Sequence, residues 1–243
     1  MMQEWYKTWF DSQYYHLLYR QRDDKEAEGF IRSLIDFIKP PPGSVMLDQA
    51  CGRGRHARIL ASLGFEVTGI DLSENSISYC KQFESDNLHF AIHDMRRIIS
   101  VNTFDYVFNL FTSMGYFRHD HDQQLTVSSA AAALKKGGYY IVDFMNVHWV
   151  ISRLIPEMHK TIDGIEFYIS RRVENGFIIK DIKFRAENHD HHYTEYVEAM
   201  TVDDFDRYFQ HAGLKRLHIF GSYSLQPFDR NLSERLILIA QKT

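Results

Sequence analysis

A glycine-rich segment that follows a short apolar run constrains this 243-residue chain more than any other feature. Residues 45–49 predict a buried strand containing Asp48, and Gly52 and Gly54 come next, before a stretch with helical character. Glycine lets the backbone turn sharply and approach a ligand, and the N–H groups that open the following helix face the same space. The pattern predicts a nucleotide-cofactor loop, although its spacing is also compatible with a dinucleotide.

Acidic residues near the ends of three successive predicted strands distinguish between these ligands. Asp48 occupies a position where a dinucleotide fold normally carries an apolar residue, so it suits a cationic ligand. Asp71 ends the second strand, at the spacing where an acid binds ribose hydroxyls. Asp94 ends the third and can accept a hydrogen bond from an amino group such as that of adenine. A ribose, an adenine and a positive charge favour S-adenosylmethionine over NAD.

The composition is that of one α/β domain. The formal net charge of −4 argues against nucleic acid as a partner. Two cysteines, Cys51 and Cys80, form no disulfide framework and fit a reducing compartment. Because no signal-peptide core or membrane-spanning segment is visible, we expect a cytoplasmic protein without a membrane partner. The composition leaves the oligomeric state open.

Predicted strands and helices alternate over residues 45–145, which is typical of a parallel sheet with helices on both faces. The strands are expected near 45–49, 66–70, 88–92, 104–109 and 138–145, and the helices near 55–63, 74–84 and 121–135. Two further helices, over 3–20 and 24–39, precede the sheet, and the prolines at 40–42 end the second one.

The last part of the chain separates the two cofactor hypotheses. A helix is expected over 201–212, followed by strands over 214–220 and 234–240. The segment between these strands has no helical periodicity and contains Pro227, which argues against the helix of a parallel crossover. We therefore expect an antiparallel last strand, whereas a nicotinamide-binding fold would end with a parallel one.

Residues 146–200 do not follow this alternation. Segments 165–173, 176–186 and 192–200 have the character of strands, and Asn175-Gly176 predicts a tight hairpin turn. We expect one domain over 1–243, with a helical lid over 1–40 and an antiparallel β insertion over 146–200 that lies above the cofactor cleft.

The order of motifs resembles the class I S-adenosylmethionine-dependent methyltransferases, specifically the small single-domain bacterial members. The resemblance runs over most of the chain and is carried by residues 45–57, 67–73, 93–96, 104–117 and 134–144. It implies a Rossmann-like, seven-stranded, mostly parallel sheet with an antiparallel last strand, S-adenosyl-L-methionine as cofactor, and methyl transfer of the EC 2.1.1 type. The family usually has glycine where Ala50 stands, so we expect a change in cofactor affinity but not in cofactor identity.

The cofactor site is expected to involve the glycine loop and the ends of the first four strands. Its predicted residues are Asp48, Ala50, Cys51, Gly52, Gly54, Asp71, Leu72, Asp94, Met95 and Leu110. Leu72, Met95 and Leu110 would flank adenine, or else pack in the core. Three arginines, Arg53, Arg55 and Arg58, either bind the methionine carboxylate or an anionic acceptor, or lie in solvent.

The acceptor side is less constrained, because methyl transfer from a sulfonium depends mainly on holding the nucleophile close and excluding water. Tyr116 and His119 are candidate proton acceptors if the nucleophile carries a proton. The resemblance places Tyr14, Tyr19 and Arg22 near the cleft mouth, and these residues and Tyr223 are candidate substrate contacts. Residues 109–112 are not the Asn-Pro-Pro-Tyr type of signature that adenine amino methyltransferases use.

Several alternatives remain open from the sequence. The acceptor is expected to be a small molecule, but its methylated atom is undetermined among oxygen, nitrogen, sulfur and carbon. An NAD(P)-dependent oxidoreductase and a non-catalytic module that binds an adenosyl ligand are the rival functions. His189, His191 and His192 are interpreted as a polar hairpin tip, and no metal site is expected.

Overall fold

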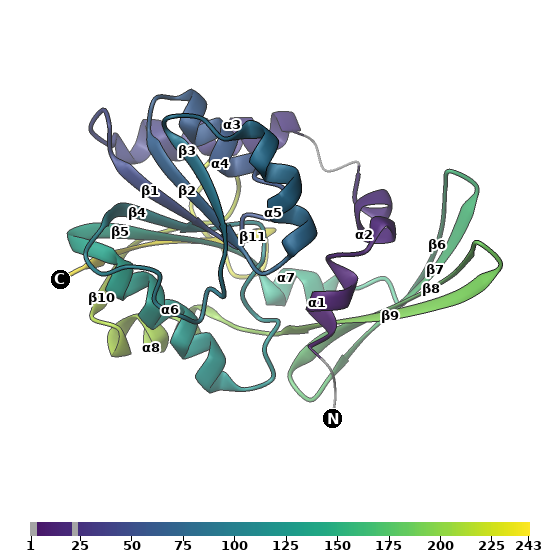
Figure 1. The fold of residues 1–243 in the computed structure, drawn as a ribbon. Helices are drawn as coiled ribbons and strands as arrows, with labels where there is room; N and C mark the ends of the chain where they lie inside the picture. Colours follow the sequence, from purple (N-terminus) through teal and green to yellow (C-terminus); the bar gives the residue numbers. More distant parts are fainter. Residues whose placement is uncertain (1–3, 21–23) are drawn as a thin grey trace.

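The computed structural model describes residues 4–20 and 24–243, and a seven-stranded sheet forms its centre (Figure 1). Across the sheet, the strands are β10 (Leu214–Phe220), β11 (Arg235–Lys242), β5 (Leu134–Met145), β4 (Phe104–Asn109), β1 (Val45–Gln49), β2 (Glu66–Asp71) and β3 (Leu88–Ile92). Strand β11 pairs antiparallel with both β5 and β10, and the other pairs are parallel. The predicted Rossmann-like sheet with a reversed last strand is confirmed.

Helices cover both faces of this sheet because successive side chains of its central strands point to opposite sides. Met46 and Phe108 pack under the helices on one face, whereas their chain neighbours Leu47 and Val107 pack under those on the other. The first face carries α3 (Asp24–Ile38), α4 (Arg55–Ser62), α5 (Glu74–Cys80) and the short η1 (Lys81–Phe83), and the second carries α6 (Asp120–Ala133) and α8 (Val202–His211) (Figure 1).

The insertion follows α7 (Val147–Ser152) and forms a separate four-stranded antiparallel sheet. Its strands are β6 (Glu157–Ile162), β7 (Ile165–Glu174), β8 (Phe177–Ala186) and β9 (His189–Glu198). Each hairpin turns through two residues with positive φ, at 163–164, 175–176 and 187–188, as tight hairpins require. Strand β6 and helix α7 were not predicted from the sequence, although Asp163-Gly164 was a signal for the β6–β7 turn.

The N-terminal region differs from its prediction, because two short helices replace the single helix expected over 3–20. Helix α1 (Trp5–Trp9) and helix α2 (Gln13–Leu18) are separated by a bend at which Ser12 accepts a hydrogen bond from the Tyr14 N–H. At the same bend, Asp11 accepts hydrogen bonds from Ser73 Oγ and Asn75 Nδ2, both at 2.5 Å. The bend therefore lets one segment contact both α5 and the insertion sheet.

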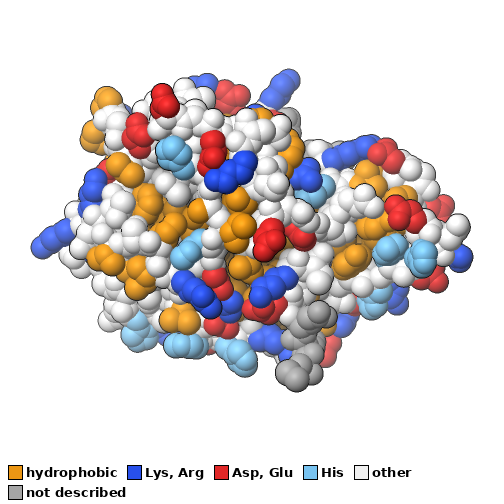
Figure 2. All heavy atoms as spheres, in the orientation of Figure 1, with side chains coloured by type: hydrophobic (Ala, Val, Ile, Leu, Met, Phe, Trp, Pro, Cys, Tyr) orange, Lys and Arg blue, Asp and Glu red, His pale blue; other side chains and the backbone are white. Residues whose placement is uncertain are grey.

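The surface shown in Figure 2 carries Lys and Arg side chains interspersed with Asp and Glu. None of the helices in the described part of the chain is long and apolar enough to span a membrane. Within residues 4–20 and 24–243, no group of three or more His, Cys, Asp or Glu side chains is arranged to hold a metal ion.

Candidate functional site

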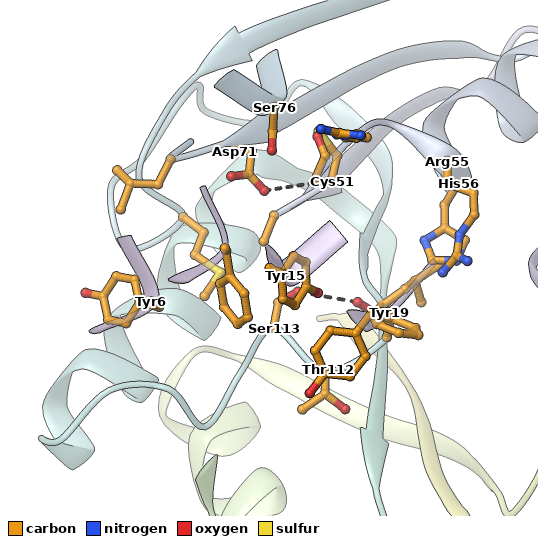
Figure 3. A pocket seen from close by; sticks show the side chains of 18 of the residues that line it. Tyr6, Tyr15, Tyr19, Cys51, Arg55, His56, Asp71, Ser76, Thr112 and Ser113 are labelled. Atoms are coloured by element: carbon orange, nitrogen blue, oxygen red, sulfur yellow. Dashed lines mark hydrogen bonds between the residues drawn. The ribbon is translucent and has the colours of Figure 1, made fainter. Parts of the chain in front are cut away.

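A cavity of about 550 Å³ lies at the carboxyl ends of the parallel strands, beneath the N-terminal helices. Loops that follow β1 to β4 supply one part of its lining, which we call the strand-end wall: Ala50, Cys51, Gly52, Asp71, Leu72, Asp94, Met95 and Leu110. Helices α1 and α2 and the residues just after them supply the other part, which we call the helical wall: Tyr6, Phe10, Tyr15, His16, Tyr19 and Arg20. In Figure 3, Asp71 and Cys51 lie across the cavity from Tyr15 and Tyr19.

The glycine loop has the predicted bend, but its two glycines serve different purposes. Gly52 has φ +54°, lines the cavity, and has no protein atom within 4 Å of the place where a Cβ would lie. Gly54 has φ +72°, and a Cβ there would lie 2.7 Å from the Phe90 ring. Gly54 therefore permits close packing of the loop on β3 and does not line the cavity. Ala50 also has a positive φ, of 56°, which is strained for a residue with a Cβ.

Asp71 joins the loops that follow β1 and β2. Its Oδ2 accepts a hydrogen bond from the Gly52 N–H, and its Oδ1 accepts one from the Ser73 N–H, both at 2.8 Å. Burial raises the pKa of Asp71, although these N–H donors favour its ionised form. A carboxylate has about four acceptor positions, so Asp71 can hold the loops and still accept from ligand hydroxyls.

Asp94 is held by Arg96, whose Nε lies 3.0 Å from Oδ1 and 3.1 Å from Oδ2. Burial opposes ionisation of Asp94, but the hydrogen bonds from Arg96 outweigh it and lower the pKa of this carboxyl. Met95 and Leu110 are buried side chains at the same side of the cavity. This part of the site combines a carboxylate with apolar surface, as a flat heteroaromatic ring with an amino group requires.

Asp48 lies beneath the glycine loop and does not line the cavity. Of the three strand-end acids that were expected to face one cleft, only Asp71 and Asp94 do so. The Asp48 side chain is 1% exposed and accepts a hydrogen bond from the Ala57 N–H at 3.1 Å. That N–H belongs to the first turn of α4, where N–H groups have no partner within the helix. Burial raises the pKa of Asp48 to about 7.

The helical wall is mostly aromatic and is fixed by the insertion sheet. Tyr19 donates a hydrogen bond to Glu195 Oε1 at 2.7 Å and contacts Lys180. Trp9 Nε1 donates to the same Glu195 oxygen at 2.7 Å. Among the described cavity residues none comes from 146–200, so the insertion acts through α1 and α2 instead of covering the cleft itself. It does so because the apolar faces of these helices pack between the sheet and the cavity.

The predicted acceptor-side residues divide into two groups. Tyr19 and Tyr116 line the cavity, and Tyr116 donates its hydroxyl to the Thr112 carbonyl. Tyr14 instead packs against Phe184 and His191 in the insertion, because it lies on the opposite face of α2. His119 is exposed just before α6 and does not line the cavity. Arg22 lies outside the described residues.

Tyr223 also lies away from the cavity. Its ring packs on Phe30 with centroids 4.4 Å apart, and its hydroxyl donates to Asp143 Oδ2 at 3.2 Å. It borders a second cavity, of about 410 Å³, that opens between the β10–β11 connection and the start of β11. The prediction of a substrate contact at Tyr223 is not supported by this position.

The three arginines of the loop and α4 all line the cavity, each over an aromatic ring. The guanidinium carbons of Arg53, Arg55 and Arg58 lie 4.8, 5.1 and 3.8 Å from the ring centroids of Tyr79, Phe111 and Phe83. His16, which was not predicted from the sequence, lies on the same side, and burial with the nearby Arg53 charge lowers its pKa to about 4. This end of the cavity is therefore cationic and suits a carboxylate or another anionic group.

Residues 46–138 match the family described as methyltransferase domain. The Bacillus subtilis (strain 168) protein YqeM, which carries the name of a methyltransferase, is 35% identical over 126 residues, covering 51% of this chain and 50% of its own. The family match includes the glycine loop and the carboxyl ends of β1 to β4. The chain spans about half the length of the curated relatives that it matches first.

Solved methyltransferases share the fold of this chain over nearly its whole length. The CcbJ methyltransferase from Streptomyces caelestis superposes with a TM-score of 0.80 at 16% identity, covering 99% of each chain. CalS10 from Micromonospora echinaspora, solved with bound S-adenosylmethionine and described as an amino pentose methyltransferase, gives a TM-score of 0.71 at 20% identity, covering 96% of this chain and 98% of its own. The N-terminal helices and the insertion are therefore included in the shared architecture.

Proposed function

We propose that this protein is a class I methyltransferase and that it transfers a methyl group from S-adenosylmethionine to a small-molecule acceptor. The observation that carries the proposal is the position of Asp71, which is anchored to Gly52 and Ser73 and still lines the cavity. A carboxylate held in this way at the end of the second strand fits a ribose. A cavity of about 550 Å³ falls within the range of about 300–1,000 Å³ that is usual for small-molecule sites.

The strand-end wall fits the cofactor in three parts. Asp71 would hold the ribose hydroxyls, and Leu72, Met95 and Leu110 would enclose the adenine beside Asp94. The residues around Ala50 and Gly52, with the cationic end of the cavity, would hold the methionine portion. A Cβ on Gly52 would meet no protein atom within 4 Å, so the loop leaves open space for a ligand there.

The helical wall would hold the acceptor and exclude water. The cofactor supplies a methyl group on a positively charged sulfur, which is already activated for in-line displacement by a nucleophile. The rings of Tyr6, Phe10, Tyr15 and Tyr116 surround this side of the cavity. Aromatic faces stabilise a nearby cation and leave little room for water. Of the two candidate proton acceptors, Tyr116 lines the cavity and His119 does not, so Tyr116 is the one that we retain.

The two rival functions make different predictions. A nicotinamide-dependent oxidoreductase requires a parallel last strand, and β11 is antiparallel to both of its neighbours. That alternative is not favoured. A non-catalytic module would bind an adenosyl ligand without transferring its methyl group to any acceptor.

A methyl-transfer assay tests the proposal. The protein is incubated with S-adenosylmethionine labelled in the methyl group and a panel of acceptors that carry one primary amine, phenol or thiol each. The panel includes an amino pentose, because CalS10 is described as acting on one. We expect label in one class of product, with one equivalent of S-adenosylhomocysteine formed for each methyl group. Tight cofactor binding with no transfer across the panel would favour the non-catalytic module.

A further inference from the structure

Two consecutive residues of the cavity wall have a backbone conformation that favours glycine. Phe111 has φ +79° and Thr112 has φ +85°, and both line the cavity directly after β4. Positive φ is uncommon for a residue with a Cβ and is a clear outlier for a β-branched residue such as threonine. Such strain persists only where the surrounding structure imposes it.

Asp143, near the end of β5, contacts both strained residues from behind. Its Oδ2 accepts a hydrogen bond from the Phe111 N–H at 3.0 Å, and its main-chain carbonyl accepts one from the Thr112 N–H at 3.2 Å. The Tyr223 hydroxyl donates to the same Oδ2 at 3.2 Å. The strained segment is therefore bonded to one residue through two separate acceptors.

Arg235, at the start of β11, holds Asp143 in place. Its Nε and one Nη lie 2.8 Å from Asp143 Oδ1, and the Asp143 side chain is only 1% exposed. An Nη of Arg235 also donates to Thr112 Oγ1 at 3.4 Å. Burial disfavours the charged guanidinium, but the Asp143 carboxylate outweighs this and raises the pKa of Arg235. Burial raises the pKa of Asp143, although Arg235 and the hydrogen bonds from Phe111 and Tyr223 favour its ionised form. The pair is largely buried and contacts the strained wall on two sides.

We infer that the Asp143–Arg235 pair is a clamp that keeps Phe111 and Thr112 in their strained conformation and so positions residues 110–113 for ligand binding. This inference rests on the proposed function. Neither member of the pair lines the cavity, so both are positioning residues. Without the clamp, Phe111 and Thr112 relax to negative φ, and the wall beside the cofactor changes shape.

The test removes the clamp without leaving a buried charge unpaired, because Asp143→Asn alone would strand Arg235 and risk unfolding. The clamp-free variant is Asp143→Leu/Arg235→Met, in which apolar side chains replace both charges. The matched control is Asp206→Asn, which breaks a bidentate pair between Asp206 and Arg216 on α8 and β10, with oxygen–nitrogen distances of 2.7 and 2.8 Å. Binding of S-adenosylhomocysteine is measured by calorimetry for each protein.

We expect the Kd for S-adenosylhomocysteine to rise at least tenfold in the clamp-free variant and to stay within twofold in the control. Adding Thr112→Gly to the clamp-free variant is expected to bring the Kd back to within fivefold of the unmodified protein, because glycine adopts positive φ readily. A merely structural role for the pair does not predict this rescue. An unchanged Kd in the clamp-free variant, or no recovery with glycine, overturns the inference.

A second readout separates failure of the clamp from failure of the proposed function. If the unmodified protein binds no S-adenosylhomocysteine, the proposed function is wrong, and the clamp is judged by Tm alone. Thr112→Gly is expected to raise the Tm of the unmodified protein, in which the clamp maintains the strain, by more than it raises that of the clamp-free variant, in which the strain has relaxed. Equal shifts in the two backgrounds contradict the clamp.

Discussion

The two walls of the cavity are built in different ways. The strand-end wall comes from loops that follow consecutive strands, and a hydrogen bond such as that from the Gly52 N–H to Asp71 holds neighbouring loops together. The helical wall depends on packing against an insertion more than a hundred residues later, through contacts such as Trp9 Nε1 to Glu195 Oε1. The seven-stranded sheet thus fixes the strand-end wall. The helical wall can change with the N-terminal helices and the insertion while the strand-end wall stays the same.

The two glycines of the loop after β1, of which only Gly52 belongs to the strand-end wall, give the largest expected effect. Gly54→Ala introduces both a strained φ and a Cβ 2.7 Å from the Phe90 ring, and we expect it to lower the free energy of unfolding by about 2–4 kcal/mol. Gly52→Ala introduces the strained φ without the clash, and we expect it to lower the free energy of unfolding by about 1 kcal/mol. Urea denaturation measures the free energy of unfolding of both variants. Equal losses would show that the packing of the loop on β3 is not a determinant of this wall.

The next largest effect on stability is expected at Asp48, and its size depends on pH. Because burial raises the pKa of this carboxyl from 3.8 to about 7, the folded state favours its protonated form. The stability that this provides is present below about pH 4 and is lost as the pH rises from about 4 to 7. We expect Asp48→Asn to match the unmodified protein at pH 4 and to exceed it at pH 8 by on the order of 2–4 kcal/mol. This expectation would be contradicted if the Tm of Asp48→Asn and that of the unmodified protein changed with pH in the same way.

Asp71 tests whether the strand-end wall binds the ribose. We expect Asp71→Ala to weaken S-adenosylhomocysteine binding by on the order of 1–3 kcal/mol, through lost charge-assisted hydrogen bonds. Asp86→Ala, at an exposed position in the turn before β3, is the control and should leave the affinity unchanged. Calorimetry at one pH compares the two, and equal affinities would remove Asp71 from the site.

Phe10→Ala tests the helical wall as Asp71→Ala tests the strand-end wall. Phe10 lines the cavity from the lid and contacts Tyr116, with ring centroids 5.1 Å apart. If this wall serves the acceptor, Phe10→Ala should change the affinity for S-adenosylhomocysteine by less than about 1 kcal/mol while reducing methyl transfer. A loss of affinity as large as that of Asp71→Ala would erase the distinction between the walls.

The smallest effect is expected at Ala50, which has φ +56°. Ala50→Gly removes the strain of the Cβ but makes the unfolded chain more flexible, so a net change within about 1 kcal/mol is expected in stability. Affinity for S-adenosylhomocysteine should rise slightly, because the methyl group narrows the loop. A drop in affinity would show that the Cβ itself supports the ligand.

The strand-end wall was largely predictable from the sequence because each of its elements has a local sequence signal. Apolar runs ended at Asp71 and near Asp94, and the glycines marked the bend, so strand order placed them together. The same reasoning misplaced Asp48, since sequence spacing does not show that its side chain turns toward the start of α4. Direction of a side chain is decided by packing, which the one-dimensional pattern does not contain.

The helical wall could not be predicted to the same degree. The periodicity over residues 3–20 showed helical character but not the bend at Ser12, because that bend serves contacts with both α5 and the insertion sheet. Tyr14 and Tyr19 looked equivalent in sequence, yet only Tyr19 lines the cavity. The clamp was also hidden, because it joins Asp143 to Arg235 across two strands that are distant in the chain.

An equilibrium titration of the unmodified protein with S-adenosylhomocysteine, S-adenosylmethionine and NADH tests directly which ligand the strand-end wall binds. We expect one site that binds both adenosyl ligands in competition with each other and does not bind NADH. Binding of NADH at this site, with neither adenosyl ligand bound, would contradict the claim that the carboxylates at the strand ends form an adenosyl site.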